Sequence, residues 1–200
     1  PTGDESTYQY DACGRLVLAR EPGRGVARYG YDSAGRLVFA QDGAMGTRRF
    51  AYDAAGQLVQ ATNGVGGRTR YEYDVRGRLV GITDPAGAVT RRTYTQLDQV
   101  DSVTDALGRT TRATYDAAGR QLAQRDPSGS TSTWTYDAAG RETSLSVDGR
   151  LVSSIERDFS GRSVRIRDFS CGTEVAHELT YDRVGRLLRR TRDAQSTTWA

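Results

Sequence analysis

The residues of this chain that could carry out chemistry are few and far apart. His177 is the only histidine, and no nucleophile motif such as Gly-x-Ser-x-Gly accompanies it. Cys13 and Cys171 are the only cysteines, and one histidine with two distant cysteines makes a poor metal site. We therefore expect no catalytic residue, no metal and no cofactor, and we interpret His177 as a strand or surface side chain.

Two short segments have the composition of ligand-binding loops. The glycine-rich stretch 63–67 lacks the Lys-Ser/Thr pair that follows the glycines of a phosphate loop. The stretch 168–172 contains Cys171, but a nucleophilic cysteine needs a neighbouring base, and the sequence identifies none. Both stretches fall at the same place in a repeating unit, so we interpret both as turns.

The repeating unit is 21 residues long. Its tyrosine recurs without slippage at Tyr10, Tyr31, Tyr52, Tyr73, Tyr94, Tyr115 and Tyr136. The motif reads Tyr-Asp-x-x-Gly-Arg-Leu, as in YDACGRL from Tyr10. Worn copies begin at Tyr94 and Arg157, and a last copy begins at Tyr181 after a step of 24 residues. A fixed period of this length is typical of a repeat protein, here with about nine units.

The residue pattern of each unit predicts a strand, a turn, a second strand and a second turn. All 11 tyrosines fall in two columns two residues apart, which puts both columns on one face of a strand. Asp-x-x-Gly then predicts a turn, because Asp bonds nearby backbone and Gly accepts a positive φ. Val17 and Ala19 alternate along the next strand, as do their equivalents. The second turn is predicted at Asp42, Asn63, Asp84, Asp105, Asp126 and Asp168.

This pattern predicts an all-β fold. We expect a repeat array of antiparallel β-hairpins, with about 21 residues and two strands in each repeat, that forms one long curved sheet. The sequence has no linker or shift in composition, so residues 1–200 are interpreted as a single array and as a fragment of a longer chain. Aliphatic residues are too few for a thick two-layer core, so one face of the sheet would line an interior or face cargo.

The repeated Asp and Arg allow two interpretations. They could be a ladder of ligand sites, or they could build the repeat itself. In the second case each Arg, such as Arg120, pairs with the Asp of its own turn or stacks on an aromatic ring of the next unit. We favour the structural interpretation, because folding alone requires these residues in every repeat. Such pairing also cancels charge locally, so a net charge of +3 and a pI near 9.0 do not indicate nucleic-acid binding.

Tyr-Asp-x-x-Gly-Arg-Leu, repeated at about 21 residues along the whole chain, resembles the Rhs or YD-repeat family. That family includes bacterial Rhs polymorphic toxins, the C component of insecticidal toxin complexes, wall-associated proteins and teneurins. The resemblance implies a sheet that spirals into a hollow shell around a C-terminal toxic domain. Many relatives end the shell with an autoproteolytic Asp-Pro-x-Gly-Leu segment. DPAGA at Asp84 and DPSGS at Asp126 lack that Leu, and we interpret both as ordinary second turns.

The resemblance implies a non-enzymatic shell segment of a secreted bacterial toxin, with type VI secretion as one route of delivery. Its partners would be the remaining repeats and the enclosed toxin domain. The alternative is a cell-surface or wall-associated module that binds glycan or a partner protein. The sequence contains no apolar run long enough to span a membrane.

Three further expectations concern the ends and the thiols. Cys13 and Cys171 are separated by seven two-strand repeats at ~4.8 Å per strand, which favours free thiols. Trp199 occupies the first aromatic column and predicts a further Tyr-Asp beyond the printed residues. Open strand edges at the ends predict edge-to-edge self-association.

Overall fold

The computed structural model describes residues 5–42, 46–169 and 173–195, and these residues form strands and turns without a helix. The prediction of an all-β array of antiparallel hairpins is therefore confirmed. The chain divides into two compact units, 1–93 with 104–108 and 94–103 with 109–200, which are described separately. Whether residues 1–200 act as a single array stays a prediction.

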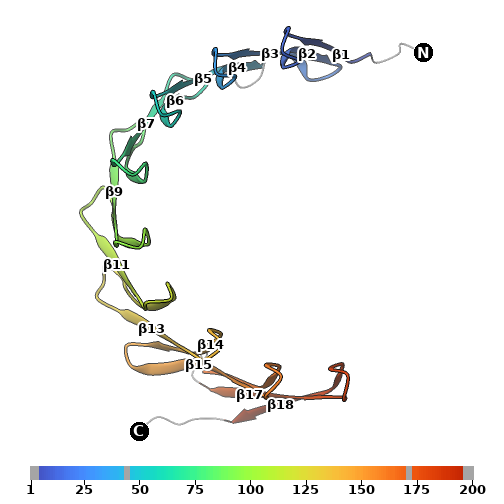
Figure 1. Ribbon diagram of the computed structural model, residues 1–200, viewed down its shortest axis with the longest axis vertical. Helices are drawn as coiled ribbons and strands as arrows, with labels where there is room; N and C mark the ends of the chain where they lie inside the picture. The colour runs from blue at the N-terminus through green and yellow to red at the C-terminus, as the bar shows by residue number, and fades with distance from the viewer. Residues whose placement is uncertain (1–4, 43–45, 170–172, 196–200) are drawn as a thin grey trace. The chain divides into compact units, whose positions relative to one another are not determined.

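The first unit holds the strands up to β9, whose last residue is assigned to the second unit (Figure 1). The strands are β1 Thr7–Tyr10, β2 Leu16–Glu21, β3 Gly25–Tyr31, β4 Leu37–Asp42, β5 Gly46–Tyr52, β6 Leu58–Thr62, β7 Arg68–Tyr73, β8 Leu79–Thr83 and β9 Val89–Tyr94. Each pairs antiparallel with the next along the chain.

The second unit continues the same pattern with β10 Val100–Thr104, β11 Thr110–Tyr115, β12 Gln121–Arg125, β13 Thr131–Tyr136, β14 Glu142–Val147, β15 Arg150–Arg157, β16 Ser163–Asp168, β17 Glu174–Tyr181 and β18 Leu187–Gln195. From β11 to β18 each strand again pairs antiparallel with the next. Most strands have the predicted length of about six residues, because two four-residue turns take up the rest of each repeat.

The two aromatic columns lie on one face, as predicted. In β7, Thr69, Tyr71 and Tyr73 are half-buried, whereas Arg68 and Arg70 are exposed. Residues directly opposite one another in an antiparallel pair share a face. The first aromatic column is opposite a small or aliphatic residue of the next strand, in the pairs Tyr8↔Ala19, Tyr29↔Ala40, Phe50↔Ala61 and Tyr71↔Ile82.

Few side chains of the sheet are buried. Among the described residues, Ala19 and Ala40 are the only buried hydrophobic residues, at 7% and 3% exposure, and no side chain is less than 2% exposed. Large rings opposite small methyl groups make one apolar layer on a single sheet, rather than a core between two sheets. This agrees with the expectation that the chain cannot build a thick two-layer core.

A β-bulge at the motif tyrosine is a feature that the sequence analysis did not predict. In β3 and β4, Gly30 pairs with Phe39 but the next residue, Tyr31, pairs with Leu37, so one residue of β4 is skipped. The same shift occurs at Tyr10, Tyr52, Tyr73, Tyr115, Tyr136, Arg157 and Tyr181. A bulge re-aims the side chains beside it, and here it lies at the position of the motif tyrosine, which Arg157 occupies in one repeat.

Candidate functional site

The first turn of each repeat is built around its aspartate. In the repeat that starts at Tyr31, the N–H of Gly35 donates to the carbonyl of Asp32 at 3.0 Å, and the N–H of Asp32 donates to the carbonyl of Arg36 at 2.9 Å. One oxygen of the Asp32 carboxylate accepts the N–H of Arg36 at 2.9 Å. Gly35 has a φ of 82°, which a residue with a side chain rarely adopts. The predicted Asp-x-x-Gly turn is confirmed.

The arginine of the motif joins one repeat to the next. Nε of Arg36 donates to the second oxygen of Asp32 at 2.7 Å. A terminal nitrogen of the same guanidinium donates to the carbonyl of Asp53, in the next repeat, at 3.3 Å. The guanidinium carbon also lies 4.8 Å from the ring centre of Tyr52, within the range of a cation–π interaction. Both predicted contacts of the arginine, with its own Asp and with the next aromatic ring, are confirmed.

The tyrosine returns a bond to the repeat before it. The hydroxyl of Tyr52 donates to the carbonyl of Leu37 at 3.0 Å, 15 residues earlier in the chain. We call the whole set of contacts the latch. It comprises the Asp and Arg of one repeat and the Tyr and Asp of the next, together with the backbone carbonyl that the Tyr hydroxyl contacts.

The latch recurs in both units. Its Arg–Asp pair is present at Arg15, Arg36, Arg78, Arg120, Arg141, Arg162 and Arg186, and ring stacking is found at Arg15, Arg36, Arg120 and Arg162. The hydroxyl bond to the preceding repeat is made by Tyr31, Tyr52, Tyr73, Tyr115, Tyr136 and Tyr181. The chemistry-bearing residues of the repeat are therefore engaged with one another.

Worn repeats keep parts of the latch with other residues. Arg157 stands in the tyrosine column, and its guanidinium donates to the carbonyl of Glu142 at 2.5 Å, again 15 residues earlier. Gln57 stands in the arginine column, and its amide donates to the carbonyl of Gly77 at 2.8 Å. In these two repeats another donor therefore takes the place of the arginine or the tyrosine and still bonds to a backbone carbonyl of a neighbouring repeat.

The latch lowers the pKa of the motif carboxylates. The backbone N–H of Arg36 is the main cause of the lowered pKa of Asp32, and the Arg36 guanidinium adds to it, because both stabilise the charged form. The backbone N–H is likewise the main cause of the lowered pKa at Asp11, Asp116 and Asp137, whereas the arginine side chain is the main cause at Asp74, Asp158 and Asp182. Burial, with a smaller contribution from Tyr71, raises the pKa of Tyr73. All these shifts favour the ionised carboxylate and the neutral phenol that the latch uses.

Second turns repeat the hydrogen-bond geometry of the first-turn aspartate. The carboxylate of Asp84 accepts the N–H groups of Ala86 and Ala88 at 2.8 and 2.9 Å. In the stretch 63–67, the side-chain oxygen of Asn63 accepts two backbone N–H groups, at 3.2 and 2.8 Å. These donors are thus turned inward rather than toward a phosphate. DPAG and DPSG, at Asp84 and Asp126, are ordinary second turns as predicted.

The second turn between β14 and β15 was not among those predicted. β14 and β15 are joined by Asp148 and Gly149 alone, with φ values of 50° and 79°, and Val147 pairs with Arg150. Asp-Gly with two positive φ values is the common two-residue hairpin turn. The pair Asp-Gly in the sequence was the signal that could have identified it.

Of the remaining candidates, only His177 and Cys13 lie among the described residues. His177 is half-buried on β17, and both of its ring nitrogens lie 3.4 Å from the guanidinium of Arg190 rather than beside a carboxylate. Cys13 is a free, exposed thiol in a first turn, whereas Cys171 and Trp199 lie outside the described residues, as does part of the stretch 168–172. In the described part of the chain, no three His, Cys, Asp or Glu side chains are grouped as a metal site would need. Those residues likewise include no helix suited to a membrane span.

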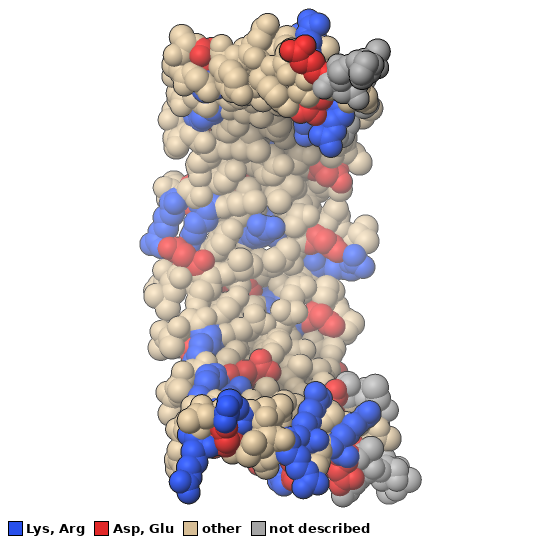
Figure 2. Space-filling model, turned by 90° about the vertical axis from the view of Figure 1, so that its right-hand side faces the viewer, with Lys and Arg blue, Asp and Glu red and all other residues tan. Residues whose placement is uncertain are grey.

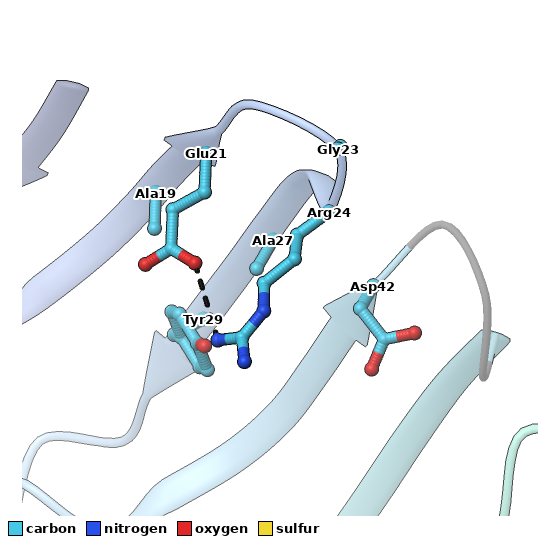
Figure 3. A pocket seen from close by; sticks show the side chains of 8 residues that line it. Ala19, Glu21, Gly23, Arg24, Ala27, Tyr29 and Asp42 are labelled. Carbon is cyan, nitrogen blue, oxygen red and sulfur yellow. Dashed lines mark hydrogen bonds and ion pairs between the residues drawn. The ribbon is translucent and has the colours of Figure 1, made fainter. Parts of the chain in front are cut away.

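A cavity with a volume of about 540 Å³ lies on β2, β3 and β4 (Figure 3). Its charged groups already have protein partners. Glu21 is bonded to Arg24 at 3.3 Å and to the hydroxyl of Tyr8 at 3.1 Å, and Asp42 lies 4.0 Å from Arg48. Ala19 and Tyr29 supply the apolar part of its wall. No convergent set of unsatisfied polar groups marks this depression as a ligand site.

The fold and the latch define a class of protein: a one-layer array of antiparallel hairpins, joined repeat to repeat by tyrosine, aspartate and arginine. The sequence matches the family model described as RHS Repeat over residues 52–89, 73–110, 94–131 and 115–150. Each match starts at a position of the motif tyrosine, at Tyr52, Tyr73, Tyr94 and Tyr115. The chain belongs to the RHS-repeat family, as the resemblance predicted.

Solved structures with the same fold include components of toxin complexes. A TcdB2-TccC3-Cdc42 structure is similar with a TM-score of 0.57 and 18% identity over 94% of this chain. A Tc holotoxin pore from Photorhabdus luminescens, with a mutation in TccC3, has a TM-score of 0.57 and 17% sequence identity over 94% of this chain. TcdB2-TccC3 without its hypervariable C-terminal region has a TM-score of 0.56 and 18% sequence identity over 94% of this chain. This chain spans only about 12% of each of those chains. No curated protein matches the sequence.

Proposed function

We propose that this chain is a non-enzymatic segment of the wall of an RHS-type shell, which encloses a C-terminal toxic domain until delivery. The observation that carries the proposal is the latch. The residue types that could have done chemistry in every repeat are engaged in joining that repeat to its neighbours. Such a segment would act by containment, within a secreted bacterial protein for which type VI secretion is one route of delivery.

A wall of one sheet has to resist opening without a thick core. Here paired strands have a backbone ladder, and several boundaries between repeats add latch contacts: an ion pair, a stacked ring or a bond to a backbone carbonyl. Repeat arrays are stabilised chiefly by such nearest-neighbour terms. Tyrosine suits this arrangement because its ring packs on one side while its hydroxyl reaches a backbone acceptor.

The surface of the wall carries little net charge. Arginines and acidic residues are interspersed on the face shown in Figure 2. A lattice of ion pairs on β15, β16 and β17 links Arg165 to Glu178 at 2.6 Å and Arg167 to Glu156 at 3.3 Å. Local pairing of this kind fits a barrier better than a basic surface that recruits nucleic acid.

The relatives support a cargo beyond the repeats. One of the similar structures is TcdB2-TccC3 without a hypervariable C-terminal region, so that protein has such a region. A variable terminal domain is what a shell with exchangeable contents would carry. By this analogy the enclosed partner of our chain would follow its repeats in the parent protein, together with the further repeats that complete the wall.

Limited proteolysis of the intact parent protein tests the proposal. A domain C-terminal to the repeats should resist protease in the intact protein and become sensitive when latches are removed by Arg36→Ala, Arg120→Ala and Arg162→Ala together. Arg20→Ala with Arg183→Ala, which change exposed arginines, are the control. A parent protein with no such domain, or one equally sensitive in all forms, would refute containment.

A binding module is the second candidate, and one observation favours it. Several turns expose apolar side chains, among them Phe159 at 113%, Val75 at 105% and Val184 at 76%. A cell-surface module could use these tips to bind glycan or a partner protein. If the 200-residue chain binds glycans on an array and loses that binding on Phe159→Ser and Val184→Ser, the binding role is favoured over the wall. An enzymatic role would instead be favoured by a catalytic turnover that is lost on His177→Ala.

A further inference from the structure

A depression of about 420 Å³ lies on β5, β6 and β7, and Arg49, Thr62 and Arg68 line it. These three residues form one row across the strands, because Arg49 pairs with Thr62 and Thr62 pairs with Arg68. Residues paired in this way share a face, which here is the face opposite to the aromatic columns. Gln60 also lines the depression, two residues before Thr62 on the same side of β6.

The four polar side chains of this row have no partners within the protein. Among the described residues, none of the side chains of Arg49, Gln60, Thr62 and Arg68 forms an ion pair or a hydrogen bond. Both arginines are exposed, and no described residue that lines the depression is acidic. Two positive charges, a hydroxyl and an amide therefore converge on one place without a counterion from the chain.

The repeat does not need an arginine at position 68. Counted at the 21-residue period, the same position holds Thr47, Val89, Thr110 and Thr131 in other repeats. Those repeats form the same antiparallel strands, so Arg68 contributes neither to the latch nor to a turn. A charged residue that folding does not require is a candidate for binding.

The turn beside the depression departs from the repeat in the same direction. Asn63 stands where second turns elsewhere have Asp42, Asp84 and Asp126, yet its side-chain oxygen still accepts two backbone N–H groups. The replacement removes a carboxylate from the neighbourhood of the two arginines. Gly66 lines the depression, and open space surrounds the place that a side chain there would occupy. This repeat alone thus combines a second arginine, a neutral turn and an uncovered floor.

We propose that the depression binds a phosphate monoester. The guanidinium groups of Arg49 and Arg68 bind the phosphate oxygens from two sides, and the Thr62 hydroxyl and the Gln60 amide donate to the oxygens between them. Guanidinium suits this task because it donates two parallel N–H bonds to one oxyanion. A phosphate monoester carries a charge of about −1.5 to −2 at pH 7, which two arginines balance.

The spacing favours one phosphate group over a polyanion. Arg49 and Arg68 are two strands apart, about 9.6 Å between their Cα atoms, so their long side chains flank a single group. Duplex DNA carries one charge for about every 1.7 Å of its axis, far more densely than this pair could neutralise. The volume of the depression leaves room for the rest of a small ester. This site lies apart from the latch and does not depend on the chain being part of a shell.

Titration of the whole 200-residue chain with methyl phosphate, followed by calorimetry, tests the proposal. Wild type should bind with a Kd on the order of 1 mM. Arg49→Gln and Arg68→Thr should each weaken binding by about fivefold or more. Arg48→Gln is the matched control, because Arg48 is an exposed arginine on the same strand but on the other face. Its affinity should equal that of wild type.

Asn63→Asp separates binding from folding. Aspartate makes the same turn elsewhere, where Asp84 accepts two backbone N–H groups at 2.8 and 2.9 Å, so the urea midpoint should not fall. The added carboxylate should nevertheless weaken the binding of methyl phosphate by about threefold or more, because it repels the anion and competes for the arginines. An affinity equal to that of wild type would contradict the proposal.

Two comparisons define the ligand. Dimethyl phosphate, a diester with one charge, should bind at least about tenfold more weakly than methyl phosphate. Vesicles that contain phosphatidic acid, whose headgroup is a phosphate monoester, test a lipid source: cosedimentation that Arg68→Thr abolishes assigns the group to a lipid, and its absence assigns it to a soluble ester. No saturable binding by wild type, equal binding of the two esters, or an equal loss in Arg48→Gln overturns the proposal.

Discussion

Replacing one latch arginine by alanine should destabilise the array measurably. In Arg36→Ala the ion pair with Asp32 is lost, and its two side chains are 33% and 22% exposed, so it contributes about 0.5 kcal/mol. The stacking on Tyr52 at 4.8 Å contributes a further ~0.5–1 kcal/mol. The 3.3 Å bond to the carbonyl of Asp53 adds about 0.5 kcal/mol. We expect the free energy of unfolding to fall by about 1.5–2 kcal/mol.

A glutamine at the same position separates these contributions. Gln57 occupies the arginine column of the next repeat, and its amide keeps a 2.8 Å bond to the carbonyl of Gly77. Arg36→Gln should therefore lose the ion pair and the stacking but retain a bond across the boundary. The fall in the free energy of unfolding should therefore be about 0.5 kcal/mol smaller for Arg36→Gln than for Arg36→Ala.

Urea unfolding followed by far-ultraviolet circular dichroism is the assay, with midpoint and slope both compared because repeat arrays can depart from two-state behaviour. The control is Arg20→Ala, an exposed arginine on β2 and outside the β4–β5 boundary, which removes the same charge. If Arg36→Ala and Arg20→Ala shift the midpoint equally, the latch contributes nothing beyond general electrostatics and the reasoning fails.

Three further perturbations follow from the same geometry. Asp98 has a φ of 62° where other repeats have glycine, so Asp98→Gly should stabilise by ~0.5–1 kcal/mol, seen as a higher urea midpoint at unchanged slope. A Cβ at Gly30 would collide with the ring of Phe39, so Gly30→Ala should cost ~1–3 kcal/mol, and a double-mutant cycle should show most of that cost vanish in Phe39→Ala. The pKa of Asp116 and its equivalents is lowered by folding, so the folded chain binds fewer protons than the unfolded chain near the ordinary value of 3.8. The contribution of these carboxylates to the free energy of unfolding should be fully present above that value and should be lost as pH drops through their lowered pKa values. Urea midpoints that stay constant from about pH 5 to about pH 2 would contradict this.

The strands and turns were predictable because each is specified by residues that are close in sequence. Tyr71 and Tyr73 share a face by the two-residue period of a strand, and Asp32 to Gly35 close a turn by their own hydrogen bonds. The partners of Arg36 could also be proposed, because the repeat places an identical unit next to it. These features depend on spacing, and spacing is what a repeated sequence shows most directly.

The bulge and the tyrosine bond could not be derived in the same way, because both depend on the backbone of a neighbouring strand. Nothing in the residues around Tyr52 indicates that its hydroxyl will reach the carbonyl of Leu37. One signal was nevertheless present. Leu37 and Val38 are consecutive apolar residues, which breaks the two-residue alternation of the strand, and a bulge opposite Tyr31 is what accommodates such a break.

The latch persists where the spacing between two motifs changes. It lies at the first turn, where Arg162 still reaches the carbonyl of Asp182 at 3.3 Å and the ring of Tyr181 at 4.9 Å although 24 residues, rather than 21, separate the two motifs. The second turns differ more from one another, and they include the tight Asp148-Gly149 turn and the glycine-rich turn at 63–67. The contacts of Arg162 at the first turn are therefore compatible with a change in the spacing between two motifs.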